Sequence, residues 1–284
     1  MIKHFLFLFV CIFYINSFSQ TNNISISSIW DLEYTAERIE SIKQLKNSKG
    51  FTRIKIDYEK KISKILYFDY KRKVFDTLIS SSNSIIPFFT EYYFSQDEKK
   101  ILLETETNKI YRRSKQSIYY VYDIQRKKIN KVFDDKIQEP LFSPDNNKIA
   151  FVYRRNIYVK NLFTDKIERI TDEGNYQILN GISDWVYEEE FGFVRAFDWS
   201  PDSKNIAFMK FDESKVPIFS MDIYGSDLYQ FPYMFRYPKA GEKNSIVSIK
   251  LYNIETKKTK KIQFGDKVPY YIPRMKFDLT QNKD

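Results

Sequence analysis

The feature that most constrains the fold is a repeated unit: an aromatic residue, then Ser-x-Asp, a polar pair and an apolar strand. Three copies are present, at Phe94–Asp97, Phe142–Asp145 and Trp199–Asp202, and each runs into an apolar stretch such as Ile101–Leu103. Proline presets the backbone for a turn in two copies, and Ser and Asp side chains can bind the free amides of such a turn. The unit therefore predicts a strand, a tight turn and a return strand.

A second repeat consists of a strand that ends in Asp or Asn, a basic turn and another strand. Its four copies are centred on Asp69, Asp123, Asn161 and Asn253. The spacing is about 40–50 residues, with one doubled interval, and four short strands per period are typical of a β-propeller blade. The helical crossovers that a parallel sheet needs are not evident in the sequence. Aromatic residues, which favour strands, make up 18% of the chain. We therefore expect an all-β fold, a partial β-propeller.

Two regions interrupt the repeats. Long connections are expected at about 171–197 and 212–245, and binding groups are often found on such connections.

Ahead of the repeats, apolar residues across Trp30–Lys46 have the spacing of a short amphipathic helix. We expect residues 20–50 to be a helical lead-in and residues 51–284 to be the propeller.

The N-terminus has the pattern of an export signal. Lys3 precedes an apolar run, Phe5–Tyr14, and Ser17 and Ser19 occupy the small-residue positions of a cleavage site. The run is shorter than the ~20 apolar residues that span a bilayer. An uncleaved anchor and a buried strand are the alternatives. We expect cleavage after residue 19 and a periplasmic or extracellular protein with no stable membrane insertion.

Histidine and cysteine are each present once, as His4 and Cys11, inside the predicted signal. The mature chain is therefore expected to have no imidazole and no thiol. This excludes Ser-His-Asp and Cys-His catalysis, zinc sites built from Cys or His, and disulfides. A calcium or magnesium site built from carboxylates alone is still compatible with the sequence, but no calcium-loop motif is present. We assign no catalytic residue, no metal site and no cofactor.

The formal net charge of +9 raises the question of nucleic-acid binding. The lysines and arginines are scattered over short turn-like stretches, such as Lys71–Lys73 and Arg126–Lys128, and do not gather on one segment. Solvated turns explain this pattern, so we expect no nucleic-acid partner.

Two clusters of charged residues are candidates for a binding site. Glu188, Glu189 and Glu190 are consecutive carboxylates, which form a solvated acidic turn, the first turn of a helix, or a site that grips an ammonium group. Arg112 and Arg113 form either a solvated pair or a guanidinium site for a carbonyl or carboxylate.

Four ordered motifs resemble those of the dipeptidyl peptidase IV family. They are NGISDWVYEEE at Asn180–Glu190, RAFDWSPD at Arg195–Asp202, FDES at Phe211–Ser214 and YPKAG at Tyr237–Gly241. They follow one another in the family's order, and the resemblance extends from about Trp30 to the C-terminus. It is closest to exported bacterial members.

The resemblance implies roles for three residues. The last two glutamates of the motif, Glu189 and Glu190, would bind the free α-amine of a peptide, and Arg112 would contact the substrate backbone carbonyl. Family members often have Arg-His where this chain has Arg112 and Arg113.

The family combines an eight-bladed propeller with an α/β-hydrolase domain and removes Xaa-Pro or Xaa-Ala dipeptides from peptide N-termini. This sequence contains about four blades and no hydrolase domain. We expect a truncated or split member that recognises peptide N-termini and is inactive alone; a separate chain could supply the missing parts. The alternative is a non-catalytic exported module that binds peptides or proteins.

Overall fold

A computed structural model describes residues 24–36, 41–46, 50–71, 74–83, 85–265 and 270–277. The chain divides into two compact units, Met1–Glu40 and Ser41–Asp284. The predicted signal, residues 1–19, lies outside the described residues. Among the residues described, no helix is long and apolar enough to cross a lipid bilayer.

The first unit contains a single described helix, α2 (Ile26–Trp30). Ser25 caps it: its hydroxyl accepts a hydrogen bond from the Ser28 amide, and the Ser28 hydroxyl accepts one from the Ser25 amide. Trp30, which ends the helix, is 80% exposed.

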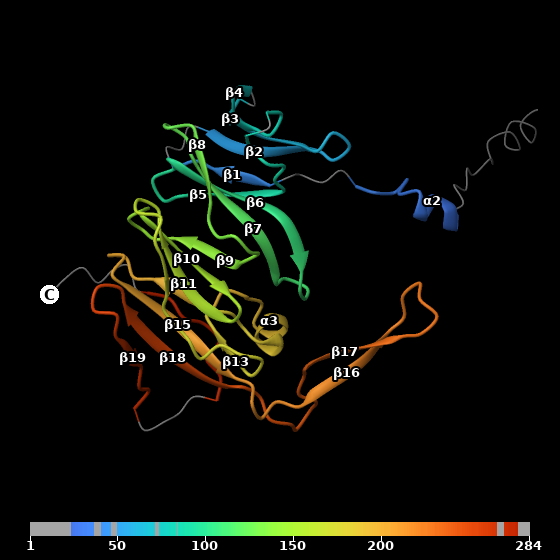
Figure 1. Ribbon diagram of the computed structural model, residues 1–284. Helices are drawn as coiled ribbons and strands as arrows, with labels where there is room; N and C mark the ends of the chain where they lie inside the picture. Colours follow the sequence, from blue (N-terminus) through green and yellow to red (C-terminus); the bar gives the residue numbers. More distant parts are fainter. Residues whose placement is uncertain are drawn as a thin grey trace, which may run out of the picture. The chain divides into compact units, whose positions relative to one another are not determined.

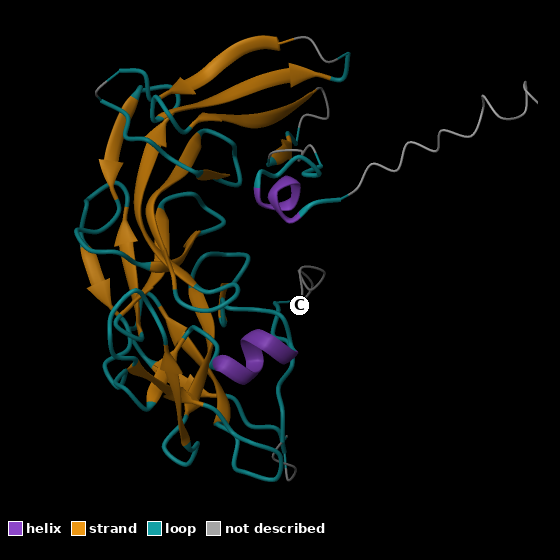
Figure 2. Ribbon diagram, turned by 90° about the vertical axis from the view of Figure 1, so that its right-hand side faces the viewer, coloured by secondary structure: helices purple, strands orange, loops and turns teal. Residues whose placement is uncertain are grey.

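The second unit is almost entirely antiparallel β-structure. Its four main sheets follow one another along the chain (Figures 1 and 2), and strands that are adjacent in sequence pair within each of the first three, which have four strands each. The first sheet contains β1 (Ile42–Gln44), β2 (Gly50–Asp57), β3 (Ile62–Asp69) and β4 (Val74–Ser80). The second contains β5 (Glu91–Phe94), β6 (Lys100–Lys109), β7 (Lys115–Asp123) and β8 (Lys128–Lys131). The third contains β9 (Gln138–Phe142), β10 (Lys148–Tyr153), β11 (Asn156–Asn161) and β12 (Ile167–Arg169).

The fourth sheet is also antiparallel but has five strands, and two excursions leave it. Its strands are β13 (Ile178–Asn180), β14 (Phe197–Trp199), β15 (Asn205–Asp212), β18 (Ile246–Asn253) and β19 (Thr259–Lys261). Helix α3 (Trp185–Glu190) lies between β13 and β14, and the hairpin β16 (Ile218–Ile223) and β17 (Phe231–Arg236) lies between β15 and β18. The hairpin extends away from the sheets (Figure 1). Four such sheets in succession, none of them closed into a barrel, form a partial β-propeller, which confirms the predicted fold class.

The predicted helix across Trp30–Lys46 is wrong in its position. The helix ends at Trp30, and Ile42–Gln44 forms an edge strand that pairs with Phe51–Arg53. The free edge of β2 offers backbone hydrogen bonds that local periodicity cannot reveal, and tertiary pairing overrides a weak helical pattern. The first sheet therefore begins at Ile42, ahead of the boundary expected at residue 51.

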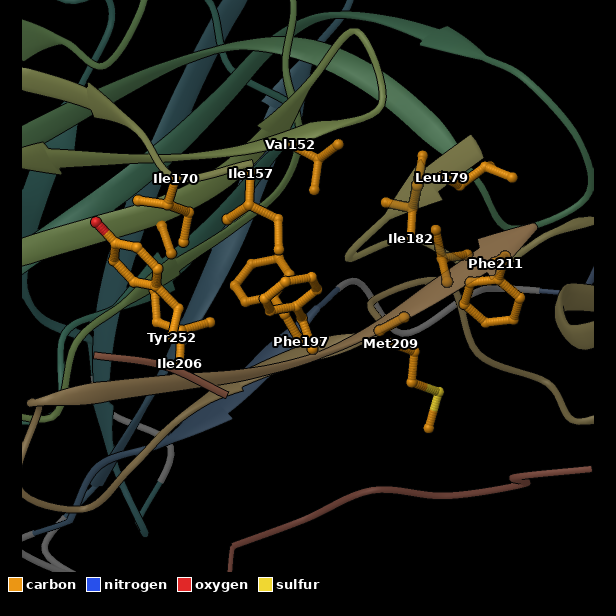
Figure 3. Packing of buried hydrophobic residues seen from close by; sticks show 14 of the residues in the cluster. Val152, Ile157, Ile170, Leu179, Ile182, Phe197, Ile206, Met209, Phe211 and Tyr252 are labelled. Atoms are coloured by element: carbon orange, nitrogen blue, oxygen red, sulfur yellow. The ribbon is translucent and has the colours of Figure 1, made fainter. Parts of the chain in front are cut away.

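The hydrophobic core lies between neighbouring sheets. Consecutive residues of β6 face opposite neighbours: Ile101 and Leu103 pack toward the first sheet, and Leu102 packs toward the third. Side chains alternate along a strand, so the part of a strand that is buried between two sheets, here Ile101–Leu103, is apolar on both faces. The largest cluster joins the third and fourth sheets, where Ile157 and Phe197 lie close together (Figure 3).

The repeated Ser-x-Asp turns also join the sheets. In each turn the residue after Asp has a positive φ, and its side chain accepts a backbone N–H from the segment before it in the chain. Glu98 accepts from the Lys46 amide at 2.7 Å, and Asn146 accepts from the Gln96 amide at 2.7 Å. Ser203 accepts from the Asp145 amide at 2.9 Å. One turn geometry thus supplies a hydrogen bond between successive sheets three times.

Replacing Asn146 with alanine should lower the free energy of unfolding by about 1–2 kcal/mol, because the Gln96 amide loses its partner. Alanine is also disfavoured at the positive φ that Asn146 adopts. Urea denaturation measures the loss. The neighbouring exposed Asn147 provides the matched control, and equal unfolding midpoints for the two alanine variants would contradict this role.

Candidate functional site

Helix α3 lies within an interruption of the fourth sheet. Strand β13 pairs with Lys210–Asp212 and β14 pairs with Ile206–Phe208, so both lie along one edge of β15. The chain leaves this edge after β13 and returns at β14, where Ile182 and Arg195 form a bridge. Gly181, at φ 76°, starts the excursion, and a Cβ there would lie 2.7 Å from the Ile157 side chain. Glycine is therefore required at this position.

Three contacts fix the helix in place. Asp184 caps it by accepting a hydrogen bond from the Tyr187 amide at 2.9 Å, and its second oxygen accepts one from the Ser245 hydroxyl. The Tyr187 hydroxyl accepts a hydrogen bond from the Ile272 amide at 3.0 Å. Burial raises the pKa of the Asp184 carboxyl. The helix is thus tied to the segments on both sides of β18 and β19.

The three consecutive glutamates have different environments. Glu188 is 1% exposed, and its Oε1 accepts hydrogen bonds from the backbone amides of Arg113 and Ser114 at 2.6 and 2.8 Å. Glu189 is partly buried, with 13% of its side chain exposed. Glu190 is exposed, and its side chain has no hydrogen bond or ion pair with any other described residue. The helix therefore turns one carboxylate inward and leaves two for the surface.

The structure brings Arg112 to Glu189. The Arg112 Nε lies 3.2 Å from the Glu189 Oε2, and Arg113 Nη1 lies 3.9 Å from the same oxygen. The Arg112 side chain is 73% exposed, and Nε is the atom that contacts Glu189, so its Nη donors remain available to a ligand. Two of the three predicted site residues, Arg112 and Glu189, are in contact, and Glu190 follows directly on the same helix.

Aromatic rings from the base of the β16–β17 hairpin pack beside this site. The Trp185 ring centroid lies 4.6 Å from that of Tyr237 and 6.3 Å from that of Phe235. Phe235 also contacts Tyr111, with ring centroids 6.2 Å apart, in the turn that carries Arg112. One hairpin thus contacts both the helix and the arginine turn.

A further buried carboxyl lies near the N-terminus of α3. Glu213, which follows β15, is 6% exposed, and its Oε2 lies 3.6 Å from Arg155 Nη1. Burial raises the pKa of Glu213 to about 7, and the charge of Asp184 adds to this, while Arg155 and Arg236 oppose it. Glu213 lies in the FDES motif at Phe211–Ser214, but the sequence analysis assigned it no role, because the motif alone does not show that this carboxyl is buried.

The sequence motif gave no sign of the distinct role of Glu188 either. All three glutamates were identical in the sequence pattern, and the resemblance implied roles for the last two only. The pair of amide donors that Glu188 binds belongs to a turn 74 and 75 residues away in the chain.

A separate cleft of about 480 Å³ lies along the first strands of the second and third sheets and beside β14. Its charged residues include Lys115, Glu139 and Arg195, and Lys115 pairs with buried Glu104 at 2.7 Å. None of the three predicted site residues lines this cleft. Within the described ranges, no group of His, Cys, Asp or Glu is arranged to hold a metal ion.

Comparison with known proteins finds similarity to part of several peptidases. Residues 95–284 match the family model described as "Dipeptidyl peptidase IV (DPP IV) N-terminal region". Prolyl endopeptidase FAP from Mus musculus is 35% identical over 189 residues, covering 65% of this chain and 25% of the relative. A probable dipeptidyl-aminopeptidase B from Trichophyton verrucosum is 30% identical over 216 residues, covering 66% of this chain and 24% of the relative. The chain thus spans about a quarter of the length of these relatives.

Solved structures agree with this relationship. The crystal structure of Porphyromonas gingivalis dipeptidyl peptidase 4 matches with a TM-score of 0.80 and 33% identity, covering 89% of this chain and 37% of that one. A putative dipeptidyl aminopeptidase IV from Bacteroides ovatus matches with a TM-score of 0.56 and 19% identity, covering 81% of this chain and 31% of that one, and supports the fold alone. The match to the family model over residues 95–284, two thirds of the chain, shows that this protein belongs to the dipeptidyl peptidase IV N-terminal region family.

Proposed function

We propose that this chain is the substrate-recognition propeller portion of a dipeptidyl peptidase IV-like serine exopeptidase. Glu189 and Glu190 bind the free α-amine of a peptide, and Arg112 holds the first backbone carbonyl. In a peptide the α-amine and this carbonyl are joined through one α-carbon, so a site for both needs a carboxylate and a guanidinium side by side.

The contact between Arg112 Nε and Glu189 Oε2, at 3.2 Å, carries this proposal. It brings the two required charges together on elements far apart in sequence, and Glu190 adds a second carboxylate at the surface. Charge-assisted hydrogen bonds of this kind contribute roughly 1.5–3 kcal/mol each. A free ammonium group gains this energy and an acylated nitrogen does not.

We further propose that the chain does not hydrolyse peptides by itself. The one histidine in this sequence is His4. Residues 5–284 therefore contain no imidazole that could act as the general base for a serine nucleophile. Incubation of the purified chain with a Gly-Pro chromogenic substrate should give the background rate of release. Turnover that an active-site serine reagent abolishes would contradict the proposal.

The same contacts would also suit a non-catalytic peptide-binding module, in which no hydrolase takes part. The coding sequence beyond residue 284 separates the two functions, because a hydrolase region in frame supports the peptidase portion and its absence supports the module.

We also propose export with cleavage after residue 19. Mass determination of the N-terminus in an exported fraction should find Gln20 first, and a retained Met1 would exclude cleavage.

A further inference from the structure

We propose that Glu188 is a positioning residue: it holds the β6–β7 turn against α3, so that Arg112 faces Glu189. The inference rests on the proposed function, because it concerns how that amine site is assembled. Glu188 acts through Arg112 and does not touch the peptide.

Outside its own helix, the hydrogen bonds of Glu188 all go to one turn. Its Oε1 accepts the successive backbone amides of Arg113 and Ser114 at 2.6 and 2.8 Å, and its main-chain oxygen accepts from Arg113 Nη1 at 3.0 Å. Two successive amides that point at one oxygen form a concave site for an anion. Here a buried side chain of the same protein occupies that site.

The turn closes on itself only at its base. The Ile110 amide donates to the Ser114 carbonyl at 2.8 Å, and the Tyr111 amide donates to the Ser114 hydroxyl at 3.1 Å. The ordered pairing of β6 with β7 ends at Lys109 and Lys115. The amides of Arg113 and Ser114 therefore depend on Glu188, and these contacts set the position of Arg112 one residue before them.

The burial of Glu188 separates its role from that of Glu189. At 1% exposure Glu188 cannot reach a peptide in solution, whereas Glu189 retains exposed surface and contacts Arg112. The two residues are consecutive in one helix, so anchoring the turn at Glu188 also fixes the distance from the turn to Glu189. This is how a buried carboxylate can set the geometry of a surface ion pair.

Two variants of Glu188 test the positioning role, because one keeps a hydrogen-bond acceptor for the two amides and the other removes it. Glu188→Gln keeps an oxygen at Oε1, the atom that accepts both amides, whereas Glu188→Ala removes it. Exposed Glu255 lies on the turn between β18 and β19, and its side chain has no hydrogen bond or ion pair with another described residue, so Glu255→Ala is the matched control.

The experiment is a double-mutant cycle on the full chain, with a fluorescent Gly-Pro peptide that has a free N-terminus. We expect Glu188→Ala to weaken binding about 5–20-fold and Glu188→Gln less than about threefold. In the Arg112→Ala background, Glu188→Ala should weaken binding less than about twofold further, because the group through which it acts is already gone. If the affinity losses of Glu188→Ala and Arg112→Ala multiplied in the double variant, the inference would be overturned. It would also be overturned if Glu188→Gln bound the peptide as weakly as Glu188→Ala.

A second measurement does not depend on peptide binding. The Arg112 Nε–H of the ¹⁵N-labelled chain should exchange with water at least about tenfold faster in Glu188→Ala than in wild type or Glu255→Ala, since its ion pair with Glu189 is released. An unchanged exchange rate would overturn the positioning role. If wild type binds free and acetylated peptides equally, the proposed function fails instead, and the exchange rates still decide the role of Glu188.

Discussion

Glu189→Gln should weaken binding of a free-amine Gly-Pro peptide by about 10–100-fold, the equivalent of one charge-assisted hydrogen bond. Glutamine keeps the shape of the side chain and loses the charge that attracts an ammonium group. The Glu189 side chain is only 13% exposed, so solvent screens this charge less than it screens a fully exposed one. Fluorescence titration of the labelled peptide against the purified variant measures the loss.

Two controls make this result specific. Glu255→Gln removes the same charge from an exposed turn and should leave the dissociation constant unchanged. The N-acetylated peptide should bind wild type and Glu189→Gln equally weakly, because it has no ammonium group. If Glu189→Gln retained wild-type affinity for the free-amine peptide, the assigned role of Glu189 would be wrong.

Glu213→Gln should stabilise the chain at pH 8 and leave its stability unchanged at pH 4. Burial raises the pKa of Glu213 from 4.5 to about 7. Between these values the folded state binds more protons than the unfolded state, so stability falls as the pH rises from about 4.5 to 7. Above pH 7 the ionised Glu213 carboxyl should lower the free energy of unfolding by about 3 kcal/mol, and glutamine removes this cost.

Urea denaturation of wild type and Glu213→Gln from pH 4 to pH 8 measures this difference. The gap between the two free energies of unfolding should open between pH 4.5 and 7 and then remain constant. Arg155, 3.6 Å from Glu213, acts in the opposite direction by favouring the ionised form. A variant less stable than wild type at pH 8 would show that the ion pair with Arg155 outweighs the cost of burial.

Most of the fold could be predicted from the sequence because it is built from local repeats. The Ser-x-Asp turns place a strand on each side, and an all-apolar run such as Ile101–Leu103 indicates a strand buried on both faces. Both expected long connections contain excursions, namely α3 and the β16–β17 hairpin. These features depend on residues that are close in sequence, and sequence patterns report them well.

The N-terminal lead-in could not be predicted in the same way. Ile42–Gln44 becomes a strand because the edge of β2 is free to pair with it, and no local pattern records that edge. The apolar spacing around these residues indicated a short amphipathic helix, and tertiary pairing with β2 overrode it.

The candidate site was predictable in part. The family resemblance assigned Arg112, Glu189 and Glu190 to one binding site, and the structure places Arg112 and Glu189 in contact. The role of Glu188 was not predictable, because which of three adjacent carboxylates points inward depends on the orientation of α3. That orientation is set by Ser245 and Ile272, both distant in sequence.

The most direct test of the central claim, that this chain grips a peptide by its free N-terminus, is one comparison of affinities. Wild-type protein is titrated with a Gly-Pro peptide and with the same peptide acetylated at its N-terminus. We predict at least tenfold tighter binding of the free-amine form, the value expected when an ammonium group meets the carboxylates of Glu189 and Glu190. Equal dissociation constants for the two peptides would contradict the claim.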